Sequence, residues 1–406
     1  MLIKSLQISN IYSFEYYEDI NKAPIIEFED GLNIIIGPNG SGKSNLVEII
    51  NQFFKRYLIK QVVVDESFID SKKSNPEVNL QNTIREIEVN QGDLSKNRNF
   101  TDKDMKVKME IQITTNDTDN LKLISGNWSK ISTYFAKYTK SVPFSVAENP
   151  VGYEDRIFTI ELTISKTGYP NHPSLSCDPS NSFTDLMFNY LRYNLYLQKI
   201  IDLANRYENQ NLPLLKNTFV LLGSNRDYTS IGQEYNAMSS SPENTEEEII
   251  KSISNEGTKL TTNSEPSIFQ YVKYRLSSLV NLYIRENLEG ITASKGGDPY
   301  TRLQNSEYFN SLNESLASNL GLNLRITSTI RNGFRFTFHD NRGREKNIRE
   351  MSSGEKGILH FIFTAYGYDV RDGLIVIDEP ELHLHPKMHK TYLELLQEIR
   401  KKIQFR

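Results

Sequence analysis

The amino-acid sequence predicts a mixed α/β protein in which both ends of the chain build one domain around a mainly helical insertion. Near the N-terminus, an apolar strand pattern leads through a glycine-rich turn into a helix pattern. Near the C-terminus, a second unbroken apolar run ends in two acidic residues. We therefore expect a discontinuous domain of residues 1–180 and 322–406, with an N-terminal antiparallel lobe and a core parallel sheet. Residues 181–321 are expected to form the helical insertion.

The composition is that of an ordinary globular protein. The chain has 406 residues, a net charge of -4 and a hydrophobic fraction of 38%, which excludes low-complexity and collagen-like classes. No stretch approaches the ~20 apolar residues of a membrane span, and the first 20 residues lack the apolar core of a signal peptide. The single cysteine, Cys177, cannot form an intrachain disulfide, so a reducing, cytoplasmic location is expected. The mildly acidic total argues against attraction of the whole surface to nucleic acid and leaves a local basic face open.

Apolar periodicity places the remaining elements. Alternating or continuous apolar residues predict strands at 2–8, 25–28, 32–36, 106–114, 156–164, 218–222, 324–330 and 334–339. Helical spacing predicts helices at 46–54, 185–205, 266–288, 303–320 and 387–402. Gly321 is expected to end the fourth of these helices. The polar segments 70–100 and 236–266 are expected to be mobile loops.

A phosphate-binding loop is predicted between the third strand and the first helix. The residues that fit the Walker A pattern G-x-x-x-x-G-K-[ST] are Gly37, Pro38, Asn39, Gly40, Ser41, Gly42, Lys43 and Ser44. The glycines let successive N–H groups face a polyphosphate, and the helix start adds its positive dipole end. We expect Lys43 to reach the β- and γ-phosphates and Ser44 to bind Mg²⁺. The alternative, a glycine-rich connector, is disfavoured because the strand and helix contexts are both present.

The C-terminal apolar run predicts a pair of catalytic carboxylates. Residues 374–377 are followed directly by Asp378, Glu379 and a proline. A central parallel strand delivers such carboxylates to its C-terminal edge, where ligands bind. We expect Asp378 to hold Mg²⁺ through water and Glu379 to polarise the attacking water as a general base. Taken alone, a strand that ends in a solvated acidic turn is the commoner explanation, but the phosphate-binding loop favours catalysis.

A third motif, M-S-S-G-E at residues 351–355, opens an apolar helix. Ser352 and Glu355 fit a capping box, which is ordinary chemistry for a helix start. The same serine, together with Gly354, would also present free N–H groups to an anion. The residues themselves leave both interpretations open.

The order of the three motifs resembles that of the ABC-class ATPases of chromosome maintenance, DNA repair and phage defence. In this resemblance M-S-S-G-E is the signature loop, and its differences from the commoner L-S-G-G-Q are familiar in the SMC and RecF-like branch. The resemblance implies an ATP sandwich of two heads bound head to tail. In it, Ser352, Ser353, Gly354 and Glu355 of one copy complete the nucleotide site of the other.

The resemblance also suggests two further site residues. His383 would lie at the dimer seam, in the loop that follows the acidic pair. The alternative, a metal site formed with His385, lacks a third ligand. Gln91 is the candidate for the glutamine that senses the γ-phosphate.

Within the ABC class, the run E-P-E-L-H-L-H-P and the insertion without a long coiled coil look like the OLD (overcoming lysogenization defect) family. The likeness rests on residues 1–60 and 322–400. Members continue through a strand and a switch histidine, and OLD nucleases add a Toprim domain; neither segment is expected in this sequence. The two D-x-D runs, at 102–104 and 117–119, are expected to be solvated loop residues and not a nuclease centre.

These observations lead to one principal hypothesis and two alternatives. The principal hypothesis is an ATPase that uses Mg²⁺, forms a homodimer or higher oligomer through its nucleotide sites and helical insertion, and controls a nuclease or other effector in anti-phage defence. Nuclease activity of the chain alone and membrane binding are not expected, whereas DNA binding is left open. The alternatives are a RecF-like DNA repair ATPase and an ATP-gated scaffold that holds a partner protein. Basic residues of the last expected helix, including Lys387 and Lys390, fit DNA or, equally, a solvated helix face.

Overall fold

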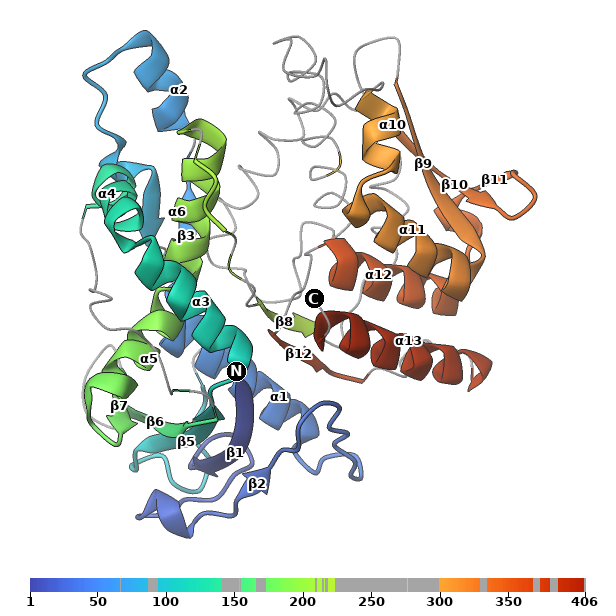
Figure 1. Cartoon of the computed structure of the whole chain (residues 1–406). Coiled ribbons are helices and arrows are strands. Elements are labelled where there is room, and N and C mark those ends of the chain that lie inside the picture. The colour runs from blue at the N-terminus through green and yellow to red at the C-terminus, as the bar shows by residue number, and fades with distance from the viewer. Residues whose placement is uncertain are drawn as a thin grey trace. The chain divides into compact units, whose positions relative to one another are not determined.

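The computed structural model describes most of the chain as two compact units. The described residues are 1–65, 67–86, 94–140, 153, 155–165, 173–208, 210–213, 215, 218–222, 276, 299–328, 334–367, 373–379 and 386–404. The first unit comprises Met1–Leu221 with Asp372–Asp378, and the second comprises Leu222–Arg371 with Glu379–Arg406 (Figure 1). The domain boundaries expected from the sequence remain a prediction.

A five-stranded antiparallel sheet organises the first unit. Its strands, in the order β2-β1-β5-β6-β7, are Ile26–Glu27, Leu2–Ser9, Met105–Gln112, Ile157–Ile164 and Pro173–Asp178. Buried and partly exposed residues alternate strictly along β5, because successive side chains of a strand point to opposite faces. This sheet and the helices around it confirm the mixed α/β class and the antiparallel N-terminal lobe.

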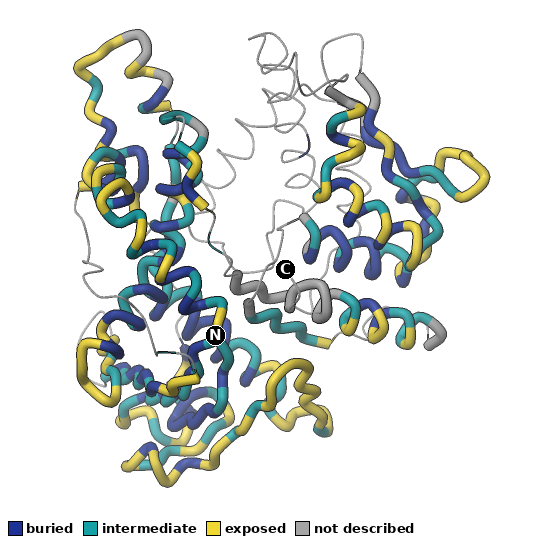
Figure 2. Tube along the Cα trace, viewed as in Figure 1, coloured by how far each residue is buried: buried dark blue, intermediate teal, exposed yellow. Residues whose placement is uncertain are grey.

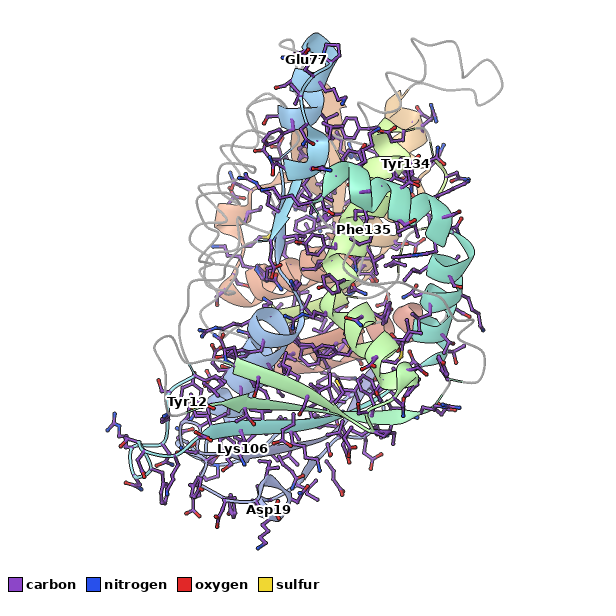
Figure 3. All side chains as sticks on the ribbon, turned by 90° about the vertical axis from the view of Figure 1, so that its left-hand side faces the viewer. Tyr12, Asp19, Glu77, Lys106, Tyr134 and Phe135 are labelled. Carbon is purple, nitrogen blue, oxygen red and sulfur yellow. The ribbon has the colours of Figure 1, made fainter. Side chains whose placement is uncertain are left out.

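Helices cover one face of this sheet, as Figure 3 shows. They are α1 (Lys43–Gln52), its π-helical continuation η2 (Phe53–Leu58), α5 (Ser182–Arg192) and α6 (Asn194–Tyr207). Phe53, Phe54, Tyr190 and Leu197 are fully buried in the core beneath them. On the other face lies the segment that carries Asp19 and the short helix η1 (Ile20–Lys22) (Figure 3). Gln7 fastens this segment, since its Nε2 donates hydrogen bonds to the carbonyls of Ile20 and Ala23.

The rest of the first unit consists of smaller elements. They are β3 (Val62–Val64), α2 (Ser67–Ser74), η3 (Leu80–Asn82), β4 (Ile84–Glu86), α3 (Thr115–Gly126), α4 (Trp128–Tyr138), β8 (Thr218–Leu222) and β12 (Gly373–Ile377). Phe135 on α4 stacks on Tyr196 of α6 with ring centroids 6.3 Å apart. Strand β12 pairs with β8, and Leu374 and Val376 pack against the core of this unit. That packing fixes the position of Asp378, the next residue after the strand.

The second unit packs helices on a three-stranded antiparallel sheet. The sheet has the order β11-β10-β9, with β9 at Leu322–Ser328, β10 at Phe334–Asp340 and β11 at Glu345–Lys346. The other elements are α10 (Pro299–Gln304), α11 (Glu307–Leu320), η5 (Ile348–Glu350), α12 (Ser353–Gly367) and α13 (Pro386–Gln404). Gly321 ends α11 in the left-handed conformation at φ 62°, which confirms the helix stop expected there. Figure 2 shows α12 mostly buried, and Ile358, Leu359 and Ile362 are among its fully buried residues.

Several expected elements differ from those observed. The segment expected as one helix over 185–205 is two helices separated at Tyr193, whose backbone leaves the helical region. The segment expected as a loop over 70–100 contains α2, η3 and β4, because Leu80, Ile84 and Leu94 are buried in the core. The helix expected at 266–288 and the loop expected at 236–266 lie outside the described residues, apart from Leu276.

The strand expected at 32–36 is not formed. Leu32, Ile34, Ile35 and Ile36 are 43–88% exposed, and the segment has no ladder partner among the described residues (Figure 2). A strand needs a neighbouring strand to pair its backbone N–H and C=O groups, so an apolar pattern alone does not make this segment a strand.

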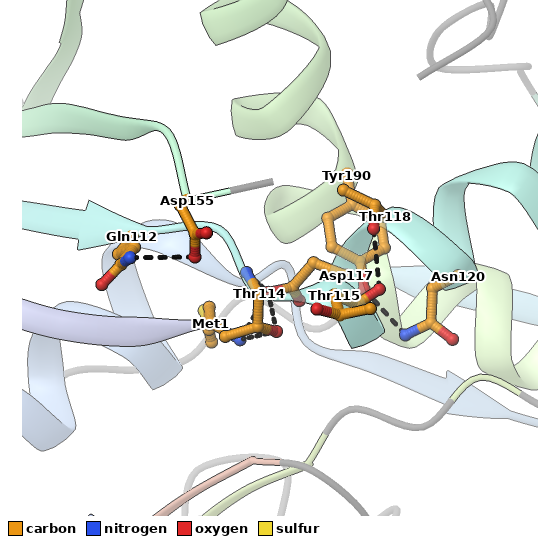
Figure 4. Close-up of polar contacts among 9 residues, drawn as sticks. All are labelled: Met1, Gln112, Thr114, Thr115, Asp117, Thr118, Asn120, Asp155 and Tyr190. Atoms are coloured by element: carbon orange, nitrogen blue, oxygen red, sulfur yellow. Dashed lines mark hydrogen bonds and ion pairs between the residues drawn. The ribbon is translucent and has the colours of Figure 1, made fainter. Parts of the chain in front are cut away.

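Asp117 also differs from expectation, because it is buried and belongs to a helix. The carboxylate is 1% exposed and lies 2.5 Å from the α-ammonium group of Met1. It accepts hydrogen bonds from the N–H and the hydroxyl of Thr114 and so closes a capping box at the start of α3 (Figure 4). By contrast, Asp102 is 61% exposed and pairs with its neighbour Lys103, as expected of a solvated loop.

No helix within the described ranges is long and apolar enough to cross a membrane.

Candidate functional site

The predicted phosphate-binding loop is a tight turn that opens α1. Gly40 and Gly42 have φ values of 82° and 93°, which only glycine adopts readily. Gly42 caps α1 without a side-chain hydrogen bond, so the first N–H groups of the helix have no side-chain cap. Such a helix start is suited to an anion because the N–H groups and the dipole both favour negative charge.

Lys43 holds its ammonium group inside this loop. Its Nζ donates to the backbone oxygens of Gly37 and Pro38 at 2.7 and 3.1 Å. An ammonium group has three donors, and these two contacts fix the charge over the loop. A lysine held over such a loop is available as a point charge for phosphate oxygens.

Ser44 and Asp378, the two residues expected to bind Mg²⁺, lie next to each other. The Ser44 Oγ donates to the Asp378 Oδ1 at 3.4 Å across 334 residues of sequence. Ser44 is the second residue of α1, and Asp378 directly follows β12. Both are oxygen ligands of the kind that Mg²⁺ prefers.

Glu379 occupies a strained turn after the strand. Its φ of 46° lies in the left-handed region, and its side chain is exposed. A residue with a Cβ pays about 1–2 kcal/mol for this conformation. Such strain clusters at functional sites, where the surrounding structure maintains it. The Glu379 side chain is therefore exposed to solvent directly after Asp378 in the chain.

The turn after β1 contacts the loop and was missed by the sequence analysis. The Ser13 Oγ accepts a hydrogen bond from Asn45 Nδ2 at 2.9 Å, and a Cβ added to Gly42 would lie 2.8 Å from it. The turn is itself strained, with φ values of 61° and 51° at Asn10 and Tyr12. No local pattern signals this contact, because it joins residues that are far apart in sequence.

Tyr12 anchors the same turn against α1 and η2. Burial raises the pKa of its phenol, and the nearby carboxylate of Glu48 adds to the increase while Arg56 opposes it. Figure 3 shows Tyr12 at the end of the sheet. The Tyr12 side chain is partly buried against the core of the first unit.

In the second unit, the motif at 351–355 forms the capping box that the sequence allowed. The Glu355 N–H donates to Ser352 Oγ at 3.3 Å, and the Glu355 Oε2 accepts from the Ser352 N–H at 2.8 Å. Met351 and Gly354 are buried, whereas Ser352 and Ser353 are exposed at the start of α12. The structure therefore shows the helix cap and an accessible serine pair in the same loop.

Two predicted site residues, Gln91 and His383, lie outside the described residues, and so does His385. Within the described part of the chain, no group of three or more His, Cys, Asp or Glu side chains is arranged to hold a metal ion. Lys390 is 84% exposed and pairs with Glu394 on the same helix, as a solvated face would.

Comparison with known families identifies the family of the chain. The chain matches the family described as "AAA ATPase domain" over residues 1–404. The chain belongs to this AAA ATPase domain family. No curated protein matches it significantly.

Solved structures similar to this family member include heads of SMC proteins. A SmcHead bound to the C-winged helix domain of ScpA has a TM-score of 0.44 and 14% identity, covering 99% of this chain and 87% of the other. A Smc head from Pyrococcus furiosus, with an extended coiled coil and bound to the C-terminal domain of ScpA, has a TM-score of 0.41 and 15% identity, covering 98% and 87%. The SMC head domain from Thermotoga maritima has a TM-score of 0.40 and 12% identity, covering 99% and 86%.

The residues present in this ATPase domain fit Mg²⁺ and a nucleotide triphosphate. Ser44 and Asp378 offer a hydroxyl and a carboxylate oxygen 3.4 Å apart, and these are donor types that would hold Mg²⁺ directly or through water. The space beside Gly40 is open, since nothing lies within 4 Å of a Cβ placed there. When bound, Mg²⁺ would neutralise charge that develops on the phosphates.

Proposed function

We propose that this chain is an ABC-class ATPase that hydrolyses ATP to ADP and phosphate with Mg²⁺. The observation that carries the proposal is the meeting of Ser44 and Asp378 beside a lysine-containing loop at a helix start. Lys43 and the loop N–H groups bind phosphate oxygens, and Ser44 and Asp378 hold the metal. Glu379, exposed on its strained turn, orients and deprotonates the attacking water.

We further propose that two copies join head to tail around ATP. The support is the form of the loop at 352–355, where Ser352 and Ser353 are exposed and Gly354 is buried at the start of a 15-residue helix. Ser352 to Glu355 of one copy then complete the nucleotide site of the other. Gln91 and His383 are proposed to line the same site.

The cellular role that we propose is control of an effector in OLD-type anti-phage defence. Its support is the motif run E-P-E-L-H-L-H-P and the absence of a long heptad pattern in residues 181–321. The insertion is proposed to contribute to oligomer formation. The effector is a nuclease or another protein on a separate chain or segment.

The experiment that tests this function traps the ATP-bound assembly. Glu379→Gln keeps the size of the side chain and removes the base, so ATP binds and is not turned over. Sedimentation of this variant with Mg²⁺ and ATP should show a dimer or larger species, and with ADP a monomer. Adding Ser352→Arg to the same chain should abolish the ATP-dependent species. An unchanged mass with ATP contradicts the proposed sandwich.

A further inference from the structure

A two-residue strand in the second unit places one lysine against the helix that begins at the serine motif. In β11, Lys346 lies opposite Phe338 of β10. Phe338 is fully buried, and its ring centroid lies 5.9 Å from that of Phe363 on α12. Residues directly opposite each other in an antiparallel pair project from the same face. The register therefore directs Lys346 toward α12.

The Lys346 side chain forms an ion pair with Glu355 of α12. The Lys346 Nζ lies 2.7 Å from the Glu355 Oε1, and the two side chains are 29% and 27% exposed. The other carboxylate oxygen, Oε2, accepts from the N–H and the hydroxyl of Ser352 at 2.8 and 3.0 Å. Lys346, Glu355 and Ser352 thus form one connected chain of polar contacts.

Glu355 carries its negative charge at neutral pH. Burial alone would raise the pKa of its carboxyl, but the hydrogen bonds from Lys346 and from Ser352 outweigh burial and lower the pKa. A carboxylate therefore lies within hydrogen-bond distance of the serine that would meet the triphosphate. A carboxylate and a triphosphate that both contact one serine repel each other unless a cation neutralises one of them.

We propose that Lys346 is a positioning residue for nucleotide-driven assembly: it neutralises Glu355 and fixes its carboxylate, so that Ser352 is oriented toward the triphosphate held by a second copy. The proposal rests on the ATP sandwich described above.

If Lys346 acts by neutralising Glu355, substitutions of Lys346 and of Glu355 should change ATP-dependent association in opposite directions. Lys346→Met leaves the Glu355 charge uncompensated and should weaken ATP-dependent association about tenfold. Glu355→Gln removes the negative charge, keeps an oxygen for the Ser352 N–H, and leaves the Lys346 cation beside the phosphates. Association of Glu355→Gln should therefore equal or exceed that of the parent. The double variant should return close to the parent.

A purely structural role predicts a different pattern. If the ion pair only fastened β11 to α12, each single variant would lose the same contact and both would associate more weakly. The double variant would then be no better than either single change. The sign of the Glu355→Gln effect separates the two roles.

The experiment measures the ATP-dependent association constant of the full chain by sedimentation, in the Glu379→Gln background so that ATP persists. Arg344→Met is the matched control, because it removes the Arg344–Asp340 pair (2.8 Å) from the same hairpin without touching Glu355. Thermal unfolding and ATP binding by the dilute chain check that each variant is folded and has an intact phosphate loop.

The expected result is weaker association for Lys346→Met alone, with recovery in the double variant and no change in Arg344→Met. Equal losses in both single variants, or no loss in Lys346→Met, would overturn the role of Lys346 while leaving the sandwich in place. If the parent fails to associate with ATP, the proposed sandwich itself is wrong, and the role of Lys346 falls with it.

Discussion

Ser44 Oγ lies 3.4 Å from Asp378 Oδ1, although 334 positions separate the two residues in the sequence. The contact joins the start of α1 to the end of β12 within the first unit. Its origin is the packing of Leu374 and Val376 against the core that also buries Leu46 and Ile49 of α1. The packing of apolar residues thus positions two polar ones.

Ser44 and Asp378 should act as a pair in Mg²⁺-dependent turnover. Ser44→Ala removes the hydroxyl and Asp378→Asn removes the carboxylate charge, and each should lower kcat by about 10²-fold, because small misplacements of reacting groups have effects of that size. Ser44→Thr keeps the hydroxyl and should retain most activity. Phosphate release across a Mg²⁺ titration checks this. Equal loss in Ser44→Thr and Ser44→Ala would contradict the metal role.

Gly42→Ala should damage the loop more than Gly40→Ala. Both positions have positive φ values, so each alanine costs about 1–2 kcal/mol of backbone strain. At Gly42 the new Cβ would also lie 2.8 Å from Ser13 Oγ, whereas at Gly40 nothing lies within 4 Å. ATP affinity should therefore fall further in Gly42→Ala.

The added Ser13→Gly change should recover part of that loss. Titration with a fluorescent ATP analogue measures the nucleotide affinity of each of these variants. Identical affinities for Gly40→Ala and Gly42→Ala would show that the Ser13 contact has no effect.

Asp117→Asn should strongly destabilise the first unit. The carboxylate is 1% exposed, pairs with the Met1 ammonium group and closes the capping box of α3 (Figure 4). Breaking a buried pair leaves an uncompensated charge and costs about 3–5 kcal/mol. Asp119 belongs to the same D-x-D run, is 48% exposed and pairs with Lys122, so Asp119→Asn should change stability by less than about 0.5 kcal/mol. Urea unfolding compares the two; similar midpoints would be inconsistent with the buried pair.

Glu208 should make the stability of the first unit depend on pH. Burial raises the pKa of its carboxyl, but hydrogen bonds from Lys137 Nζ and Tyr138 Oη, both 2.6 Å, outweigh burial and lower the pKa below 4.5. A pKa that is lower in the folded state means that Glu208 stabilises the fold above pH 4.5. That stabilisation is lost as the pH falls through the lower folded pKa.

The measurement is the difference in unfolding free energy between the parent and Glu208→Gln, from about pH 7 to about pH 3. The difference should be constant near neutrality and shrink in acid. Glu77→Gln removes a charge at an exposed position and serves as the control. A difference that grows in acid would reverse the assigned sign.

The sequence predicted features that depend on neighbours in the chain. The turn at Gly40 and Gly42, the capping box of Ser352 and Glu355 and the stop at Gly321 all rest on a few adjacent residues. Local conformational preferences suffice for such features. The period-two pattern likewise located β1, β5 and β6.

Features that depend on distant packing were not predictable in this way. Ser13 approaches Gly42, and Lys346 reaches Glu355, only because of how the chain folds. The same holds for Asp117, whose polar sequence context suggested solvent although its partner is Met1. Conversely, residues 32–36 have a strong strand pattern without a ladder partner among the described residues. Apolar periodicity records which residues favour burial and not which segments meet.

The most direct test of the account is phosphate release by the purified chain, with Mg²⁺ and ATP, as a function of protein concentration. An ATPase that completes its site with a second copy should show specific activity that rises with concentration and then saturates. Lys43→Ala and EDTA should each abolish the release. Specific activity that is independent of concentration would contradict the sandwich, and undiminished release by Lys43→Ala would contradict the assignment of the phosphate-binding loop.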